Sequence, residues 1–282
     1  MGSMYDVSPR PVWVDTLYRF VRPYWDALLN GEFAEGAAAT RLSVDEVRGW
    51  IWQMYPFVHA FPKFLAEALI KVEDDYSRNF LIDNIRVEKQ HAEHWIWMGQ
   101  GFGLAKQEML DLAEGKRPIL RDVQSLTDWM WYVNTRGSLA EAVAATSYAI
   151  EGVTGDLTRK TLQGFEAYGK LPGVEMNALT SRWMRSHAKY DDEHPRMALE
   201  VIKRYATTER LQQKAMAAAK RSLQLLDLAF NTSYRAYSSA ADPNAWADVD
   251  LRGRDRRRES RNIPFPERRF GERRGKKLRS VA

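Results

Sequence analysis

Four of the five histidines in this chain lie in two short segments, where carboxylates accompany them at helical spacing. Residues 84–95 (NIRVEKQHAEHW) and residues 186–195 (SHAKYDDEHP) are these segments, and a third, residues 147–152 (SYAIEG), adds one glutamate. Imidazole and carboxylate together are the ligand types that suit iron or manganese. The three segments, each on a predicted helix, therefore favour a helical protein with a metal site.

The spacing within residues 186–195 places three polar side chains on one helix face. An α-helix turns about 100° per residue, so Asp191 lies about 40° and His194 about 20° from His187 around the axis. Asp192 lies about 140° from His187 and is predicted to point elsewhere. His187, Asp191 and His194 are therefore the candidate ligands of this segment.

The other two segments supply weaker signals. Glu88 and His91 form an i, i+3 pair, the device that di-iron carboxylate bundles use, whereas His94 lies about 120° from Glu88 and is the poorer candidate. Glu151 lies in a small and apolar run, where a carboxylate must be paired, protonated or metal-bound. Taken alone, the Glu88–His91 pair also fits a solvated helix, and Glu151 also fits an ion pair with an arginine. Only the combination of the three segments favours a metal site. We interpret His59 as a core or cavity histidine.

Composition excludes several kinds of protein. The chain has no cysteine, so disulfides, thiolate metal sites and cysteine nucleophiles are excluded, and a cysteine-dependent thiaminase with them. It has no run of the roughly 18 to 20 apolar residues that cross a bilayer, and its N-terminus lacks the pattern of a signal peptide. We therefore expect a cytoplasmic protein.

The basic charge is concentrated near the C-terminus. Residues 251–282 carry 13 lysines and arginines against 4 acidic residues, whereas the preceding 250 residues carry 29 basic and 33 acidic ones. A segment so charged and so poor in apolar residues cannot offset the entropy cost of ordering. We predict a helical domain over residues 1–240 and a basic, disordered tail over residues 241–282. The tail is expected to be a solvated appendage, with weak contact to nucleic acid or an anionic surface as the alternative.

Residues 1–240 show helical patterns throughout, with no convincing alternation of β-branched residues. Capping boxes at residues 43–46 and 138–141 indicate two helix starts, and Pro56 and Pro62 are expected to kink the second helix. The predicted fold class is all-α, one bundle of seven or eight helices. The expected helices cover about 11–30, 43–71, 74–100, 105–114, 122–135, 138 through Glu151, 174–205 and 207–238.

Three stretches of the sequence resemble a known family of enzymes. NIRVEKQHAEHW, AATSYAIEGVTGD and HAKYDDEHPRMALEVI are similar to the metal-binding segments of the heme-oxygenase-like di-iron oxygenases, within the TenA/PqqC-like superfamily, and closest to its UndA-type medium-chain fatty-acid decarboxylases. The resemblance implies a heme-oxygenase-like bundle, two Fe(II) ions per chain, O2 as co-substrate and an external reductant. The positions that match the iron ligands of this family are Glu88, His91, Glu151, His187, Asp191 and His194.

The implied reaction is oxidative decarboxylation of a medium-chain fatty acid to a terminal alkene. One alternative is N-oxygenation or oxidative cleavage of an amine or amino-acid-derived substrate, since relatives on this fold do such chemistry. A second is a non-enzymatic interaction protein that uses the bundle and the basic tail. His59 and Tyr148 are candidate substrate-pocket residues, and His59 stands where the UndA-type enzymes have glutamate. A homodimer is left open, and the electron donor is not specified.

Overall fold

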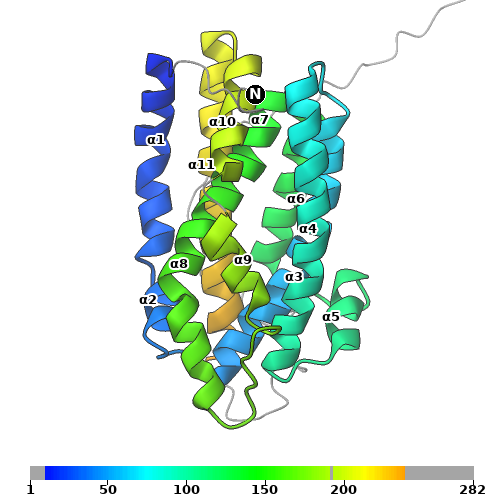
Figure 1. Cartoon of the computed structure of the whole chain (residues 1–282), viewed down its shortest axis with the longest axis vertical. Coiled ribbons are helices and arrows are strands. Elements are labelled where there is room, and N and C mark those ends of the chain that lie inside the picture. The colour runs from blue at the N-terminus through cyan, green and yellow to red at the C-terminus, as the bar shows by residue number, and fades with distance from the viewer. Residues whose placement is uncertain (1–9, 191–192, 239–282) are drawn as a thin grey trace, which may run out of the picture. The chain divides into compact units, whose positions relative to one another are not determined.

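A computed structural model of the chain describes residues 10–190 and 193–238 (Figure 1). The predicted tail, residues 241–282, lies outside the described residues, and so do Asp191 and Asp192. Every secondary-structure element in the described part is helical, which confirms the all-α prediction.

The helices form a bundle in which α1 runs along one side and α3 and α4 run along the other, with α5 outside them (Figure 1). The last helix, α11, packs against α1, α3, α6, α7 and η1 and so joins the two sides. The elements are α1 (Val12–Leu29), α2 (Glu32–Ala38), α3 (Val44–Leu69), α4 (Asp75–Gly101), α5 (Lys106–Ala113), α6 (Arg121–Arg136), α7 (Leu139–Val143), η1 (Ala144–Ile150), α8 (Glu151–Ala167), η2 (Tyr168–Lys170), α9 (Arg182–Tyr190), α10 (Glu193–Tyr205) and α11 (Glu209–Arg235).

The two predicted capping boxes begin α3 and α7. At α3, the Ser43 hydroxyl accepts a hydrogen bond from the Glu46 amide at 3.2 Å, and the Glu46 carboxylate accepts one from the Ser43 amide at 2.6 Å. Ser138 and Glu141 make the same pair of bonds at α7. Each box satisfies backbone donors that a helix start would otherwise leave unpaired, so both predicted starts are confirmed.

The structure corrects the predicted helices at two places. It contains a short helix, α2, that was not expected, and the helix expected over 174–205 begins only at Arg182. Before that point the Asn177 side-chain oxygen accepts hydrogen bonds from the amides of Leu179 and Thr180. This local turn competes with helix formation, which is why the helical pattern does not extend back to 174.

A cluster of buried aromatic rings holds the bundle together around Trp50 of α3, which is 1% exposed. Rings from four other helices pack against its indole, at centroid distances of 4.8 to 5.8 Å. They are Phe33 of α2, Trp95 of α4, Phe165 of α8 and Phe230 of α11. Aromatic pairs at such distances add stabilisation beyond the area they bury. The cluster therefore fixes α4 and α8, two of the helices that carry predicted ligands.

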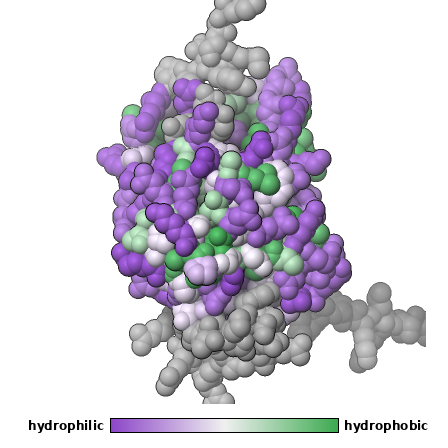
Figure 2. Space-filling view, turned by 60° about the horizontal axis from the view of Figure 1, so that its bottom comes forward, coloured by the Kyte–Doolittle hydropathy of each residue, from purple (hydrophilic) through white to green (hydrophobic). Residues whose placement is uncertain are grey.

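The surface contrasts with this interior. On the face shown in Figure 2, hydrophilic side chains predominate and hydrophobic ones form small patches between them. Within residues 10–190 and 193–238, no helix combines the length and the apolar character that a membrane span requires.

The first prediction concerns the close contact between α2 and α8. A Cβ atom added at Gly164 would lie 2.0 Å from the carbonyl oxygen of Ala37 and 2.6 Å from that of Ala38. We expect Gly164→Ala to lower the free energy of unfolding by about 2 to 3 kcal/mol, because backbone must move apart. Gln163→Ala, at the exposed neighbouring position, should change it by less than about 0.5 kcal/mol. Urea unfolding followed by circular dichroism measures both, and equal stability of the two variants would contradict this packing.

Candidate metal centre

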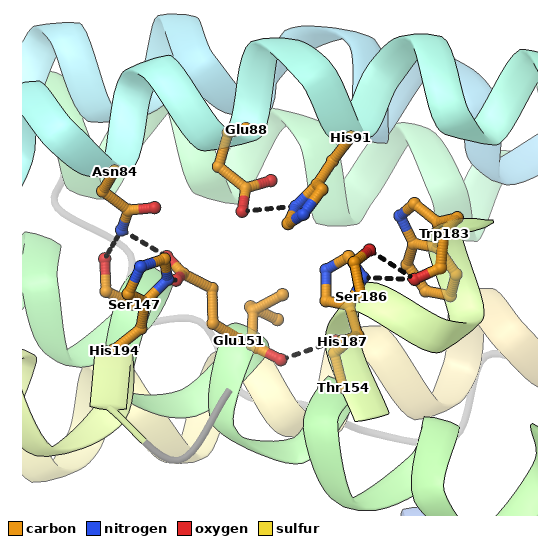
Figure 3. Close-up of polar contacts among 11 residues, drawn as sticks. Asn84, Glu88, His91, Ser147, Glu151, Thr154, Trp183, Ser186, His187 and His194 are labelled. Carbon is orange, nitrogen blue, oxygen red and sulfur yellow. Dashed lines mark hydrogen bonds and ion pairs between the residues drawn. The ribbon is translucent and has the colours of Figure 1, made fainter. Parts of the chain in front are cut away.

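The segment that carries Glu151 is not a continuous α-helix. The short helix α7 passes into the π-helix η1, and α8 begins at Glu151 itself. π-Helical turns are rare and occur frequently at functional sites. Here both Ser147 of η1 and Glu151 face α4, where Asn84 contacts the two side chains (Figure 3). The sequence contains no pattern from which this π-helix could be predicted.

Three buried side chains from two helices form a group that could hold a metal ion. Glu88 and His91 come from α4 and His187 from α9, and one potential ligand atom of each lies within 4.8 Å of the others. The His91 Nδ1 atom lies 2.9 Å from Glu88 Oε1, and the rings of His91 and His187 have centroids 4.0 Å apart. Figure 3 shows the three side chains converging between the two helices.

Glu151 and His194 lie together as a second pair beside this group (Figure 3). The Nδ1 atom of His194, on α10, lies 3.1 Å from Oε2 of Glu151, on α8. Glu151 is 4% exposed, and its charge acts on Glu88, so the two carboxylates belong to one polar cluster. The structure thus brings together predicted ligands from four helices. The sixth predicted ligand, Asp191, lies outside the described residues, as does Asp192.

The electrostatics of the cluster favour a cation. Burial, and then the charge of Glu151, raise the pKa of the Glu88 carboxyl well above its ordinary value. Burial also opposes ionisation of Glu151, but the hydrogen bond and charge of His194, with bonds from Asn84 and Ser147, lower its pKa overall. The two carboxylates therefore repel each other in a medium of low dielectric, and a bound cation would relieve that repulsion.

The histidines of the group are suited to metal binding for the same reason. Burial lowers the pKa of His91 to about 4, and burial followed by the charge of His91 lowers the pKa of His187 well below its ordinary value. Both imidazoles are neutral at neutral pH, which is the form that binds metals. Neutral imidazoles, ionisable carboxylates and deep burial together fit an iron site.

Two contacts fix the orientation of predicted ligands. The Nδ1 atom of His187 lies 2.9 Å from the carbonyl oxygen of Trp183, which can only accept, so Nδ1 carries the proton and Nε2 keeps its lone pair. Asn84, fully buried on α4, donates from Nδ2 to Glu151 Oε1 at 2.8 Å and to Ser147 Oγ at 3.1 Å. Sequence analysis missed Asn84, although it lies four residues before Glu88 and hence on the same helix face.

The other sequence-derived candidates lie in different surroundings. His94 is buried beside His91 but is not in the group of three ligands, and its Nδ1 has no hydrogen-bond partner among the described residues. The hydroxyl of Tyr55 lies 3.4 Å from His59 Nδ1, and burial, then Lys63, lowers the pKa of His59. The structure does not join His59 to the metal-ligating group. Tyr148 is buried and lines a cavity together with residues of α1, α8 and α10. The roles of these residues stay predictions.

The comparison with protein families gives the class of this protein. The family described as iron-containing redox enzymes matches residues 48–227, which include Glu88, His91, Glu151, His187 and His194. The match covers well over half of the chain, so the protein belongs to this family of iron-containing redox enzymes. A comparison with curated proteins found no match.

Solved structures agree with this assignment at the level of the fold. A TenA homologue from Pseudomonas syringae pv. tomato is 25% identical with a TM-score of 0.71, and the match covers 83% of this chain and 100% of that one. A domain with a heme-oxygenase-like fold from Shewanella denitrificans is 16% identical with a TM-score of 0.66, covering 83% and 94%. A TenA homologue from Pyrococcus furiosus is 15% identical with a TM-score of 0.65, covering 79% and 100%. The chain therefore has the TenA and heme-oxygenase-like fold.

The second prediction distinguishes a ligand from a neighbouring histidine. We expect His187→Ala to weaken Fe(II) binding by at least about 100-fold, because it removes a neutral imidazole from the group of three. His94→Ala is the matched control, since His94 is also buried and adjoins His91 but lies outside that group. Anaerobic Fe(II) titration with a competing chelator measures both affinities. An equal loss of affinity in the two variants would show that the group is wrongly assigned.

The third prediction concerns the residue that holds Glu151. Asn84→Leu removes both hydrogen bonds at nearly constant volume, so we expect Fe(II) affinity to fall by roughly 10- to 100-fold. Asn134→Leu is the control, because Asn134 of α6 is equally buried, and the Oδ1 atoms of both asparagines have no hydrogen-bond partner among the described residues. Both variants should lose stability, but only Asn84→Leu should lose iron. If Asn134→Leu lost iron to the same extent, the effect of Asn84→Leu would be one of stability alone.

Proposed function

We propose that this protein is a non-heme di-iron oxidoreductase that uses O2 and an external reductant. The observation that carries the proposal is the buried group of Glu88, His91 and His187 with the Glu151–His194 pair beside it, in a member of an iron-containing redox family. The proposed ligands of two Fe(II) ions are Glu88, His91, Glu151, His187, Asp191 and His194.

The net charge of such a centre supports an anionic substrate. Three carboxylates and two Fe(II) ions leave one positive charge, so a substrate carboxylate would neutralise the buried site. The chain itself contributes the fixed geometry. The Trp183 carbonyl holds the tautomer of His187, and Asn84 holds the carboxylate of Glu151. The ligand side chains on α4, α8 and α9 are buried. Iron, when bound, supplies the redox chemistry with O2.

Within this class we propose oxidative decarboxylation of a medium-chain fatty acid to a terminal alkene. The support is the similarity of the three ligand segments to the UndA-type decarboxylases and the preference of the charge balance for a carboxylate. The reaction balances when the acid loses CO2 and two hydrogens, O2 is reduced to two molecules of water, and the external reductant supplies the other two electrons. The ligand set and the family membership both weigh against a purely structural role.

The fourth prediction tests this reaction. The Fe(II)-loaded protein, given O2, a reductant and a panel of C8 to C14 acids and amines, should release CO2 and an alkene one carbon shorter than the acid. Headspace gas chromatography detects the alkene, and mass spectrometry detects any oxygenated amine. His187→Ala should give no product, because it loses iron. Absence of alkene from every acid, together with oxygen incorporation into an amine, would replace decarboxylation by N-oxygenation.

A further inference from the structure

A cavity of about 330 Å³ opens between α1, η1, α8 and α10, apart from the polar cluster. This volume lies in the range of small-molecule sites, which are mostly apolar with a few polar groups. Its apolar lining includes Val14, Val21 and Trp25 from α1 and Leu199 from α10. Such a surface suits a hydrocarbon chain.

One wall of the cavity is formed by residues that neighbour predicted metal ligands in the sequence. Tyr148 lines the cavity three residues before Glu151, and Pro195 lines it immediately after His194. Gly152, the residue after Glu151, lies at the same wall, since a Cβ atom there would come 2.4 Å from Trp25 Cη2 and 3.3 Å from Pro195 Cγ. The lining therefore includes close sequence neighbours of Glu151 and His194, but neither of these two predicted ligands lines the cavity.

The polar groups of the lining are predominantly cationic. The lining includes Arg10, Arg22 and Arg196 but a single acidic residue, Asp156. Asp156 already accepts a hydrogen bond from Trp25 Nε1 at 2.7 Å and pairs with Arg159 at 2.6 Å. Arg10, just before α1, pairs with Asp15 at 2.8 Å, and Arg22 of α1 pairs with Asp26 at 2.6 Å. Arg196 forms no ion pair with a described residue.

Tyr148 provides a further polar group. Its side chain is only 8% exposed, and its hydroxyl makes no hydrogen bond with a described residue. The hydroxyl is not sealed from solvent, so an anion in the cavity can accept a hydrogen bond from it. The cavity thus offers a donor and a cation beside an apolar surface, and these groups together select an anion that has an apolar chain.

We propose that this cavity binds an organic carboxylate at a site of its own, separate from the metal centre, with its apolar chain against Trp25 and Leu199 and its anionic group held by Arg196 and Tyr148. The inference goes beyond the proposed function, because the ligand of the cavity is not the acid that reacts at the metal centre. Side chains of the protein recognise the carboxylate, so its binding in the cavity does not require the metal ions.

The fifth prediction tests the cavity by direct binding. Isothermal titration of the full-length protein with decanoate, 1-decanol and decylamine is performed anaerobically, with Fe(II) bound and after metal removal. Decanoate should bind more tightly than the other two in both states. Arg196→Glu should weaken decanoate binding by roughly tenfold, because it removes a charged partner, and should leave decanol unchanged. Tyr148→Phe should weaken decanoate by roughly threefold for the loss of one hydrogen bond.

Two further variants make this test specific. Arg19→Glu carries the same charge change on α1 outside the cavity lining and should alter decanoate binding by less than about twofold. Leu199→Trp fills the cavity from its rim and should weaken both decanoate and decanol. The proposal is overturned if decanoate binding requires iron, or if it is equally strong in wild type, Arg196→Glu and Leu199→Trp.

The outcomes also separate this inference from the proposed reaction. Decanoate binding that responds to the cavity variants, without turnover of any acid, would support the cavity and reject decarboxylation. Alkene formation by a protein whose metal-free form does not bind decanoate would support decarboxylation and reject the cavity.

Discussion

The central constraint in this protein is the burial of two carboxylates close together in a helical bundle. Glu88 and Glu151 are 5% and 4% exposed, and neither pairs with a lysine or arginine in the described part of the chain. Leaving such charges uncompensated is costly, so their partners must lie at fixed positions around them. His91 lies 2.9 Å from Glu88 and His194 lies 3.1 Å from Glu151, and His187 completes the group of potential ligands, so α4, α8, α9 and α10 must meet at one place. A bound cation would complete the compensation.

The aromatic core supplies the rigidity that this arrangement needs. Trp50 joins α2, α4, α8 and α11 to α3, and Trp95 continues the contact to Trp183 of α9 at 4.5 Å. The ring of Trp183 lies 4.3 Å from that of His187, and its backbone carbonyl fixes the same histidine. Packing in the core and orientation of a predicted ligand thus depend on the same residue. Substitutions at Trp95 or Trp183 should therefore affect metal binding as well as stability.

The cationic cavity and the candidate metal centre are separate sites that share neighbouring elements of the bundle. The lining of the cavity comes mainly from α1 and α10, with Tyr148 from η1 and Asp156 from α8, whereas the metal-ligating group lies between α4 and α9. The π-helix is the element that serves the two sites, because it presents Ser147 to Asn84 and Tyr148 to the cavity. A change in this segment would alter the environment of Glu151 and the binding of a ligand at once. That coupling gives a physical reason for an irregular turn at this point of the bundle.

The sequence by itself determined the helical class, the capped starts of α3 and α7, and the convergence of His and Glu residues on helix faces, because local spacing and side-chain-to-backbone bonds suffice for these features. Its helix expected over 174–205 was wrong at the start, since the turn at Asn177 is also local but lacks a periodic signature. Only the tertiary structure decided that Asn84 holds Glu151, that the Glu151 segment contains a π-helix, and that Tyr148 shares a cavity with arginines of other helices. These features join residues more than 60 positions apart, or depend on packing against other helices, and no local pattern encodes such contacts.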